Sequence, residues 1–110
     1  MYIISNNQQL YLKMSTKFVN ELAEILLLLS NIEDQYNLAA FNQTEKKVYY
    51  TIATRLANAP KCNITDVINS SGFSRSTIYK TIKKFEKQGL VKMEQSFGDK
   101  REFNLDLISA

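Results

Sequence analysis

The stretch SRSTIYKTIKKFEKQGLV, residues 74–91, decides the fold. Ser74 is a residue type that caps helix N-termini, and the apolar residues that follow it are spaced four and three apart, at Ile78, Ile82 and Phe85. This spacing is typical of a helix with one buried face. The sequence therefore predicts a helix that begins after Ser74 and buries this stripe.

The other side of the same helix is cationic and rich in hydroxyl groups. Between residues 74 and 92 there are six basic residues and one acid, Glu86. Arginine can bind guanine through two hydrogen bonds in the major groove, and hydroxyl and amino groups can contact phosphates or base edges. The alternative interpretation is an ordinary lysine-rich face that contacts only solvent. We predict DNA contacts from Ser74, Arg75, Ser76, Thr77, Tyr79, Lys80, Lys83 and Lys84.

A shorter helix is predicted just before this one. Asn63 can cap it, Asp66 places an acid at its third position, and Gly72 provides a left-handed stop after it. Two short helices separated by a turn that contains glycine form the helix-turn-helix arrangement. In this arrangement the N-terminal end of the second helix enters the major groove of DNA.

Another helix is expected farther upstream, with Val48 and Ile52 on its buried face. Thr44 is predicted to cap this helix, and Glu45 lies favourably in its first turn. Pro60 ends it, because proline cannot continue a helix.

After residue 89 the pattern changes from helical spacing to alternation, which is typical of strands. Two alternating runs flank a Gly-Asp turn. One side of the first run is formed by Val91, Met93, Gln95 and Phe97, and one side of the second by Phe103, Leu105 and Leu107. Such a pair of runs predicts a β-hairpin. A basic hairpin tip beside a basic helix is the wing of a winged helix. We therefore predict that Lys100 and Arg101 contact the narrow minor groove, where negative potential is concentrated.

The first part of the chain has the pattern of one long helix, about Asn7 to Tyr36. Residues 25–29 are apolar on every side, whereas a helix that packs on one face only should keep a polar side. This excess of apolar residues favours a helix with two buried faces, one packed against its own chain and one packed against a second copy. The alternative is a monomer whose core wraps the helix. The residues predicted to form the dimer are Phe18, Leu22, Ile25, Leu26 and Leu29.

The charged residues are also unevenly distributed between the two parts of the chain. Residues 1–43 hold two basic and four acidic residues, whereas residues 44–110 hold twelve basic and seven acidic ones. We predict an N-terminal dimerisation helix at 1–43 and a winged helix-turn-helix DNA-binding domain at 44–110. The fold class is mostly α with a small β-hairpin wing (α+β).

The composition argues against several other classes of protein. The chain has no histidine and a single cysteine, Cys62, so a zinc site, a histidine-based catalytic pair and an internal disulfide are not expected. We predict no enzyme activity and no cofactor. The longest apolar block is five residues and no signal peptide is recognisable, which favours a cytoplasmic protein without a membrane span. Cys62 is interpreted as a buried structural thiol, with a redox sensor as the alternative.

Residues 41–107 resemble the MarR-type winged helix-turn-helix transcriptional regulators. The stretches that carry the resemblance are residues 63–72, residues 74–91 and the wing DKREFNLDL at 99–107, where Asp99 and Arg101 fall on the family's Asp-x-Arg pattern. The resemblance implies that Asp99 orients the wing, that Arg101 enters the minor groove and that residues 74–84 contact the major groove. Ser71 departs from the family pattern, which usually has a large apolar residue there.

The family's members usually continue into C-terminal helices that dimerise with the N-terminal one, whereas this sequence ends at Ala110. We therefore expect the N-terminal helix to form the dimer alone, and we expect no small-molecule effector. The function predicted is that of a homodimeric transcriptional regulator that binds specific sequences of double-stranded DNA. Two alternatives remain open, a winged-helix module that binds another protein and a DNA-binding factor of plasmid or phage replication.

Overall fold

The computed structural model describes residues 6–98 and 101–108, with side chains from Ser15 onward within these ranges. The chain divides into two compact units, Met1–Ala40 and Phe41–Ala110. Within the described residues the elements in order are four helices and two strands: α1 (Asn6–Gln35), α2 (Gln43–Asn58), α3 (Ile64–Ser71), α4 (Arg75–Lys87), β1 (Val91–Gln95) and β2 (Phe103–Leu107). The predicted fold class, mostly α with a β-hairpin wing, is confirmed.

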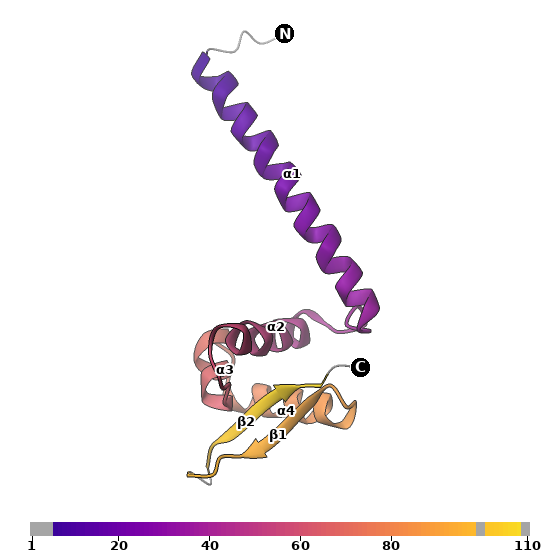
Figure 1. Cartoon of the computed structure of the whole chain (residues 1–110), viewed down its shortest axis with the longest axis vertical. Coiled ribbons are helices and arrows are strands. Elements are labelled where there is room, and N and C mark those ends of the chain that lie inside the picture. The colour runs from indigo at the N-terminus through magenta and orange to yellow at the C-terminus, as the bar shows by residue number, and fades with distance from the viewer. Residues whose placement is uncertain (1–5, 99–100, 109–110) are drawn as a thin grey trace. The chain divides into compact units, whose positions relative to one another are not determined.

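The first unit is the single helix α1, which is continuous over 30 residues (Figure 1). It contains no glycine or proline, and its bounds differ by one residue from those predicted. The helix ends where Asn37 adopts a positive φ of 60° and the amide of Leu38 donates to the carbonyl of Glu33 at 2.7 Å. This is the hydrogen-bond pattern of a Schellman motif, which satisfies carbonyls that the helix would otherwise leave open.

Helix α2 begins at Gln43, two residues earlier than a Thr44 cap would allow, so that prediction was wrong. The cap is Asn42, whose side chain accepts from the amide of Glu45 at 2.8 Å. The carboxylate of Glu45 accepts in return from the amide of Asn42 at 2.9 Å. Because this reciprocal capping box satisfies two amides, it outweighs the single bond that Thr44 could offer.

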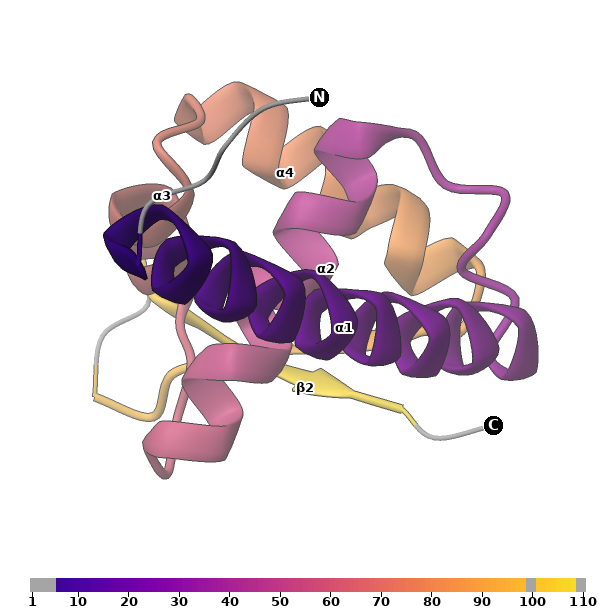
Figure 2. The ribbon, with the colours of Figure 1, turned by 90° about the horizontal axis from the view of Figure 1, so that it is seen from above.

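The helix-turn-helix consists of α3 and α4 (Figure 2). Its helices have the predicted bounds and caps. Asn63 and Asp66 form a second capping box at the start of α3, and Gly72 closes α3 with a φ of 77°. Ser74 caps α4. Each of these signals lies within a few residues of the helix end that it determines, which is why the sequence was sufficient to place them.

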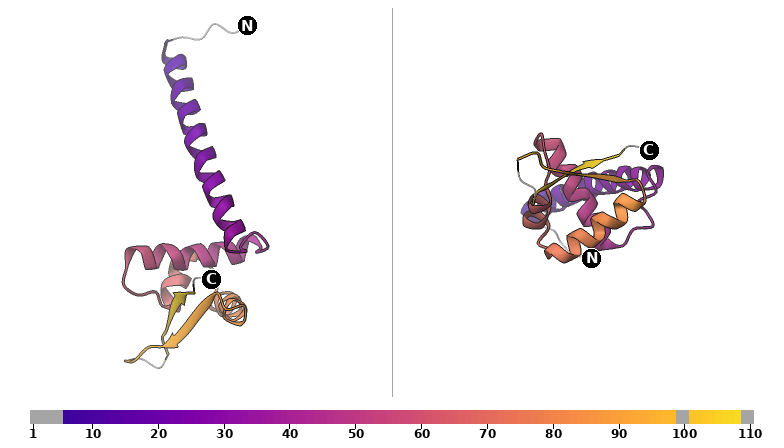
Figure 3. Two further views of the ribbon diagram at one scale, coloured as in Figure 1. Left: turned by 45° about the vertical axis from the view of Figure 1, so that its right-hand side comes forward. Right: turned by 90° about the horizontal axis from the view of Figure 1, so that it is seen from below.

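The wing is a two-stranded antiparallel hairpin (Figure 3). In its register Val91 pairs with Leu107 and Met93 pairs with Leu105. The strand β2 also contacts the segment before α3, because the amide of Leu105 donates to the carbonyl of Cys62 at 2.7 Å. The alternation was extended too far at one point. Phe97 lies beyond the end of β1 and is fully exposed instead of facing inward.

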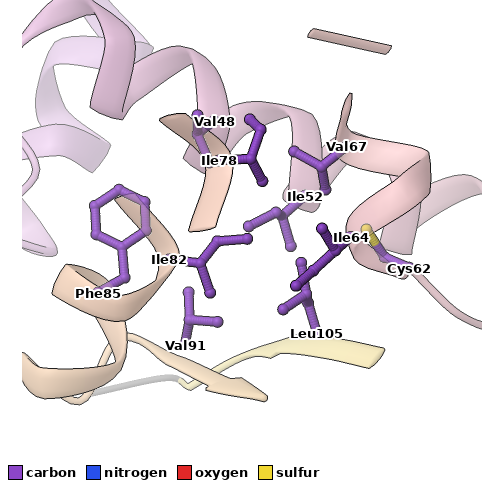
Figure 4. Close-up of a cluster of buried hydrophobic side chains, with 10 residues drawn as sticks. All are labelled: Val48, Ile52, Cys62, Ile64, Val67, Ile78, Ile82, Phe85, Val91 and Leu105. Atoms are coloured by element: carbon purple, nitrogen blue, oxygen red, sulfur yellow. The ribbon is translucent and has the colours of Figure 1, made fainter. Parts of the chain in front are cut away.

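The core of the second unit takes side chains from all five of its elements and from Cys62 (Figure 4). The predicted stripe of α4 lies at its centre, since Ile78, Ile82 and Phe85 are fully buried. Phe41, just before α2, packs its ring against that of Phe85 at a centroid distance of 5.0 Å. The remaining fully buried members are Val48, Ile52, Cys62, Ile64, Val67, Val91 and Leu105.

Ser71 is buried although it is polar. Its hydroxyl oxygen accepts from the amide of Phe73 at 3.2 Å, in the turn between α3 and α4. The departure from the family pattern therefore places a hydrogen bond at the turn, where a large apolar residue would have added to the core.

Over the described part of the chain, no helix combines the length and the apolarity that are needed to cross a membrane.

Candidate nucleic-acid interface

The N-terminal turn of α4 is an exposed cluster of hydroxyl groups. Ser74 Oγ accepts from the amide of Thr77 at 3.2 Å, lies 3.2 Å from the hydroxyl of Ser76 and donates to Thr77 Oγ1 at 3.0 Å. A helix start of this kind carries amide groups and a positive dipole end, both of which attract phosphate. Ser74, Arg75 and Ser76 are all exposed, as a contact with DNA requires.

The basic side chains of α4 lie on the side away from the core. At 3.6 residues per turn, Ser76, Lys80, Lys83 and Lys87 fall on one face, and all four are exposed. The core stripe occupies the opposite face, so one side of this helix is apolar and the other side is positively charged. Lys83 also forms an exposed ion pair with Glu86 at 3.5 Å, which leaves it accessible to an external phosphate.

Thr77 and Tyr79, which were both assigned to DNA, have structural contacts of their own. The carbonyl of Thr77 accepts from the hydroxyl of Thr81 at 2.8 Å, and both threonines are at least half-buried. Tyr79 is half-buried and packs against the core. Thr81 was missed by sequence reasoning, because a buried threonine that bonds within its own helix leaves no pattern in the sequence.

Lys84 has a specific partner within the protein. Its ammonium group forms an ion pair with the carboxylate of Glu45 on α2, 39 positions away in the sequence. Glu45 is almost completely buried, whereas about half of the Lys84 side chain remains exposed. The hydrogen bond from Lys84, together with that from the amide of Asn42, holds the pKa of Glu45 below its usual range. The pair fastens α4 to α2, with Lys84 at the edge of the exposed face.

The wing is held at its base by polar contacts. The amide of Ser96 donates to the carbonyl of Glu102 at 2.8 Å, and the hydroxyl of Thr65 on α3 donates to the carboxylate of Glu102 at 2.7 Å. Beyond these contacts Phe97 and Arg101 are exposed near the tip. The predicted wing residues Asp99 and Lys100 lie outside the described residues.

With these elements in place, comparisons with known proteins identify the family. The sequence profile of the family described as sugar-specific transcriptional regulator TrmB matches residues 39–104, which is more than half of the chain. The chain belongs to this family. The matched region of this TrmB-family regulator runs from just before α2 to the start of β2. A search of curated proteins found no significant sequence match.

Solved structures with the same fold include MarR-family regulators, which confirms the predicted resemblance. Among the similar structures are the MepR–DNA complex of S. aureus (15% identity, TM-score 0.55), a MarR protein of Peptoclostridium difficile (25%, 0.52) and the DNA complex of Sco3205 of Streptomyces coelicolor (22%, 0.52). These alignments cover 86%, 83% and 98% of this chain. They span 72%, 57% and 64% of the three related chains.

The residues assigned to dimerisation in this TrmB-family regulator lie along α1. The side chains of Phe18, Ile25 and Leu26 are 63%, 60% and 54% exposed, Leu22 is also exposed and Leu29 is half-buried. Three further large apolar residues that were not assigned, Val19, Leu27 and Leu28, are equally exposed. Such a surface is typical of a helix that packs against another protein chain.

The single cysteine has the environment of a structural thiol. Cys62 is fully buried and packs in the core of the winged helix. Burial, with a smaller contribution from the carboxylate of Asp66, raises the pKa of its thiol to about 11. Because the thiolate is the reactive form, this residue is protected from oxidants and alkylating reagents at neutral pH.

Proposed function

We propose that this protein regulates transcription by binding specific sequences of double-stranded DNA as a homodimer, with α4 in the major groove and the wing in the minor groove. The observation that carries the proposal is the exposed surface of α4, on which Ser76, Lys80 and Lys83 share one face and Arg75 is exposed in the first turn. Arginine at this position can bind guanine through two hydrogen bonds, and the lysines can neutralise phosphates.

The rigidity of α4 supports the same proposal. Base contacts require side chains that are held in one position on a fixed helix. Three buried apolar side chains, the Ser74 cap and the ion pair to Glu45 fix this helix from its core side and its start. The exposed face is then left without any role in holding the fold. DNA complexes are also known for the structurally similar MepR and Sco3205.

The homodimer rests on the exposed apolar side chains of α1. A two-fold symmetric dimer would present two α4 helices to successive major grooves, with half-sites about 34–36 Å apart on a pseudo-palindrome. Lysine and arginine contacts to phosphates would make the affinity fall steeply with salt.

Selection of bound sequences from a random duplex pool tests the proposal. We expect enrichment of a palindromic consensus. Arg75→Ala should reduce the preference for this consensus over random DNA, because a bidentate base contact contributes about 1–3 kcal/mol of discrimination. Lys92→Ala is the matched control, since Lys92 lies on β1 and its ammonium is already paired with Glu94 at 2.7 Å. An equal loss of affinity on every sequence would show that Arg75 makes no base contact.

Two other outcomes would point to the alternative functions. No enrichment, and no binding to duplex DNA near physiological salt, would favour a module that binds another protein. A replication factor would also enrich a consensus, so the consensus should be placed at a reporter promoter. A change in reporter output that the wild-type chain causes and the Arg75→Ala variant does not cause would assign the role to transcription.

A further inference from the structure

The wing is fastened to the helix-turn-helix at Glu102, the residue next to the exposed Arg101. The hydroxyl of Thr65 on α3 donates to Glu102 Oε1 at 2.7 Å, across 37 positions of the sequence. The carbonyl of Glu102 accepts from the amide of Ser96 at 2.8 Å, one step beyond the paired residues of β1 and β2. The main chain of Glu102 therefore binds the other arm of the hairpin, and its side chain binds the body of the winged helix.

Two backbone contacts between the wing and the body lie farther from the tip. The amide of Leu105 donates to the carbonyl of Cys62, and Asn104 forms an isolated bridge with Asn63. These contacts hold the middle of β2. A hairpin of two strands is only marginally stable by itself and twists readily, so the end of β2 toward the tip needs a contact of its own. Thr65 provides this contact.

The position of the Glu102 carboxylate depends on the Thr65 hydroxyl. Its second oxygen, Oε2, is buried and has no hydrogen-bond partner within the described part of the chain. Glu102 also lines an open cleft of about 320 Å³, together with Ser96 and Asn104. A buried polar group that loses its hydrogen bond is destabilised, so without the hydroxyl the carboxylate would turn toward solvent in this cleft. The neighbouring main chain would move with it.

We propose that the hydrogen bond between Thr65 and Glu102 sets the position of the wing relative to α4, and thereby places Arg101 in the minor groove. This inference rests on the proposed function and adds the residues that determine selectivity for the base pairs flanking each half-site. Because α3 leads through the turn at Gly72 into α4, the bond ties the minor-groove contact to the same rigid body as the major-groove contact. Thr65 and Glu102 are positioning residues that act through Arg101.

Two DNA duplexes test this inference. They share the selected consensus and differ only in the flanks of each half-site, with an A-tract in one and a run of G·C pairs in the other. We expect the wild-type chain to bind the A-tract duplex more tightly, because A-tracts have a narrow minor groove that attracts arginine. Thr65→Val, which keeps the shape of the side chain and removes its hydroxyl, should reduce the ratio of the two Kd values about threefold. The conservative variant Thr65→Ser keeps the hydroxyl and should restore the ratio.

An Arg101→Ala background separates positioning from a general effect on the fold. Arg101→Ala alone should reduce the same ratio, and adding Thr65→Val should reduce it no further, because both changes remove one contact. A Thr65→Val chain that is less stable in urea but has an unchanged ratio would overturn the inference and leave the minor-groove contact in place. A further reduction in the Arg101→Ala background would also overturn it, since Thr65 would then act by another route. Equal affinity of the wild-type chain for the two duplexes, or no effect of Arg101→Ala, would remove the proposed minor-groove contact itself.

Discussion

The ion pair between Glu45 and Lys84 allows a direct test of how the recognition helix is held. The change is Glu45→Gln, which keeps an oxygen for the amide of Asn42 but removes the charge that faces Lys84. A buried hydrogen bond to a charged group contributes about 1.5–3 kcal/mol, and a fully exposed ion pair about 0–1 kcal/mol. The side chain of Glu45 is 8% exposed and that of Lys84 is 52% exposed, so the pair lies between these limits. We expect a loss of about 1–2 kcal/mol in the free energy of unfolding.

Urea unfolding of a double-mutant cycle measures this value. The second variant is Lys84→Met, which removes the charge and keeps most of the apolar stem. We expect a coupling energy of about 1 kcal/mol between the two positions, because residues in direct contact do not behave additively. Additive effects of the two substitutions, within the error of about 0.3–0.5 kcal/mol that is usual for independent sites, would refute the structural role of the pair.

The pH dependence of the same variant gives an independent check. Because the pKa of Glu45 is lower in the folded chain than its ordinary value of 4.5, the ionised carboxylate stabilises the fold. This stabilisation is fully present above pH 4.5 and is lost as the pH falls through the lowered pKa. The difference in stability between the wild-type chain and Glu45→Gln should therefore be constant near neutral pH and shrink below pH 4.5. A difference that grows on acidification would contradict the assigned pKa direction.

Three further predictions follow from single residues. Ile82→Ala should lower the free energy of unfolding by about 2–5 kcal/mol, because Ile82 is fully buried at the centre of the core, and a loss below 1 kcal/mol in urea unfolding would contradict this packing. Cys62 should react with a thiol reagent at neutral pH only after urea unfolding, and rapid reaction of the folded chain would contradict its burial and raised pKa. Phe97→Ala should weaken binding to duplex DNA about fivefold in Kd without changing stability, because an exposed apolar side chain at a wing tip can insert into the minor groove. An unchanged Kd for that variant would show that Phe97 makes no contact.

The accuracy of the sequence predictions depends on the range of the interactions involved. The bounds of α3 and α4 were predicted because Asn63, Gly72 and Ser74 act on amides and carbonyls within three or four residues. The same reasoning from local residue types failed at the start of α2, where both Asn42 and Thr44 could serve as the cap. Only the reciprocal hydrogen bond between Asn42 and Glu45 decides in favour of Asn42.

The contacts that fix the candidate site are long-range, and charge patterns do not reveal them. Lys80, Lys83 and Lys84 look equivalent in the sequence, because all three are lysines on the helix predicted to bind DNA. Only the packing of α2 against α4 brings the buried carboxylate of Glu45 to one of them. Similarly, the alternation that continues to Phe97 does not show that the strand ends two residues earlier.

The different environments of Lys83 and Lys84 predict different effects on DNA binding, although the two residues are adjacent. Lys83 is exposed and forms an exposed ion pair with Glu86, three residues along the same helix, so its ammonium can exchange that partner for a phosphate. Lys83→Met should therefore weaken binding to all sequences and reduce the slope of log K against log salt by about 0.9, the value for one phosphate contact. Lys84→Met should lower stability and leave this slope unchanged, because the ammonium of Lys84 is held by the buried carboxylate of Glu45. If Lys84 contacted a phosphate instead, that carboxylate would lose its counter-charge. Measuring the affinity for DNA at several salt concentrations separates the two roles. The temperature should stay below the midpoint of thermal unfolding of each variant. Equal slopes for the two variants would show that charge on the surface of α4, and not the individual partners of each lysine, determines how this face meets DNA.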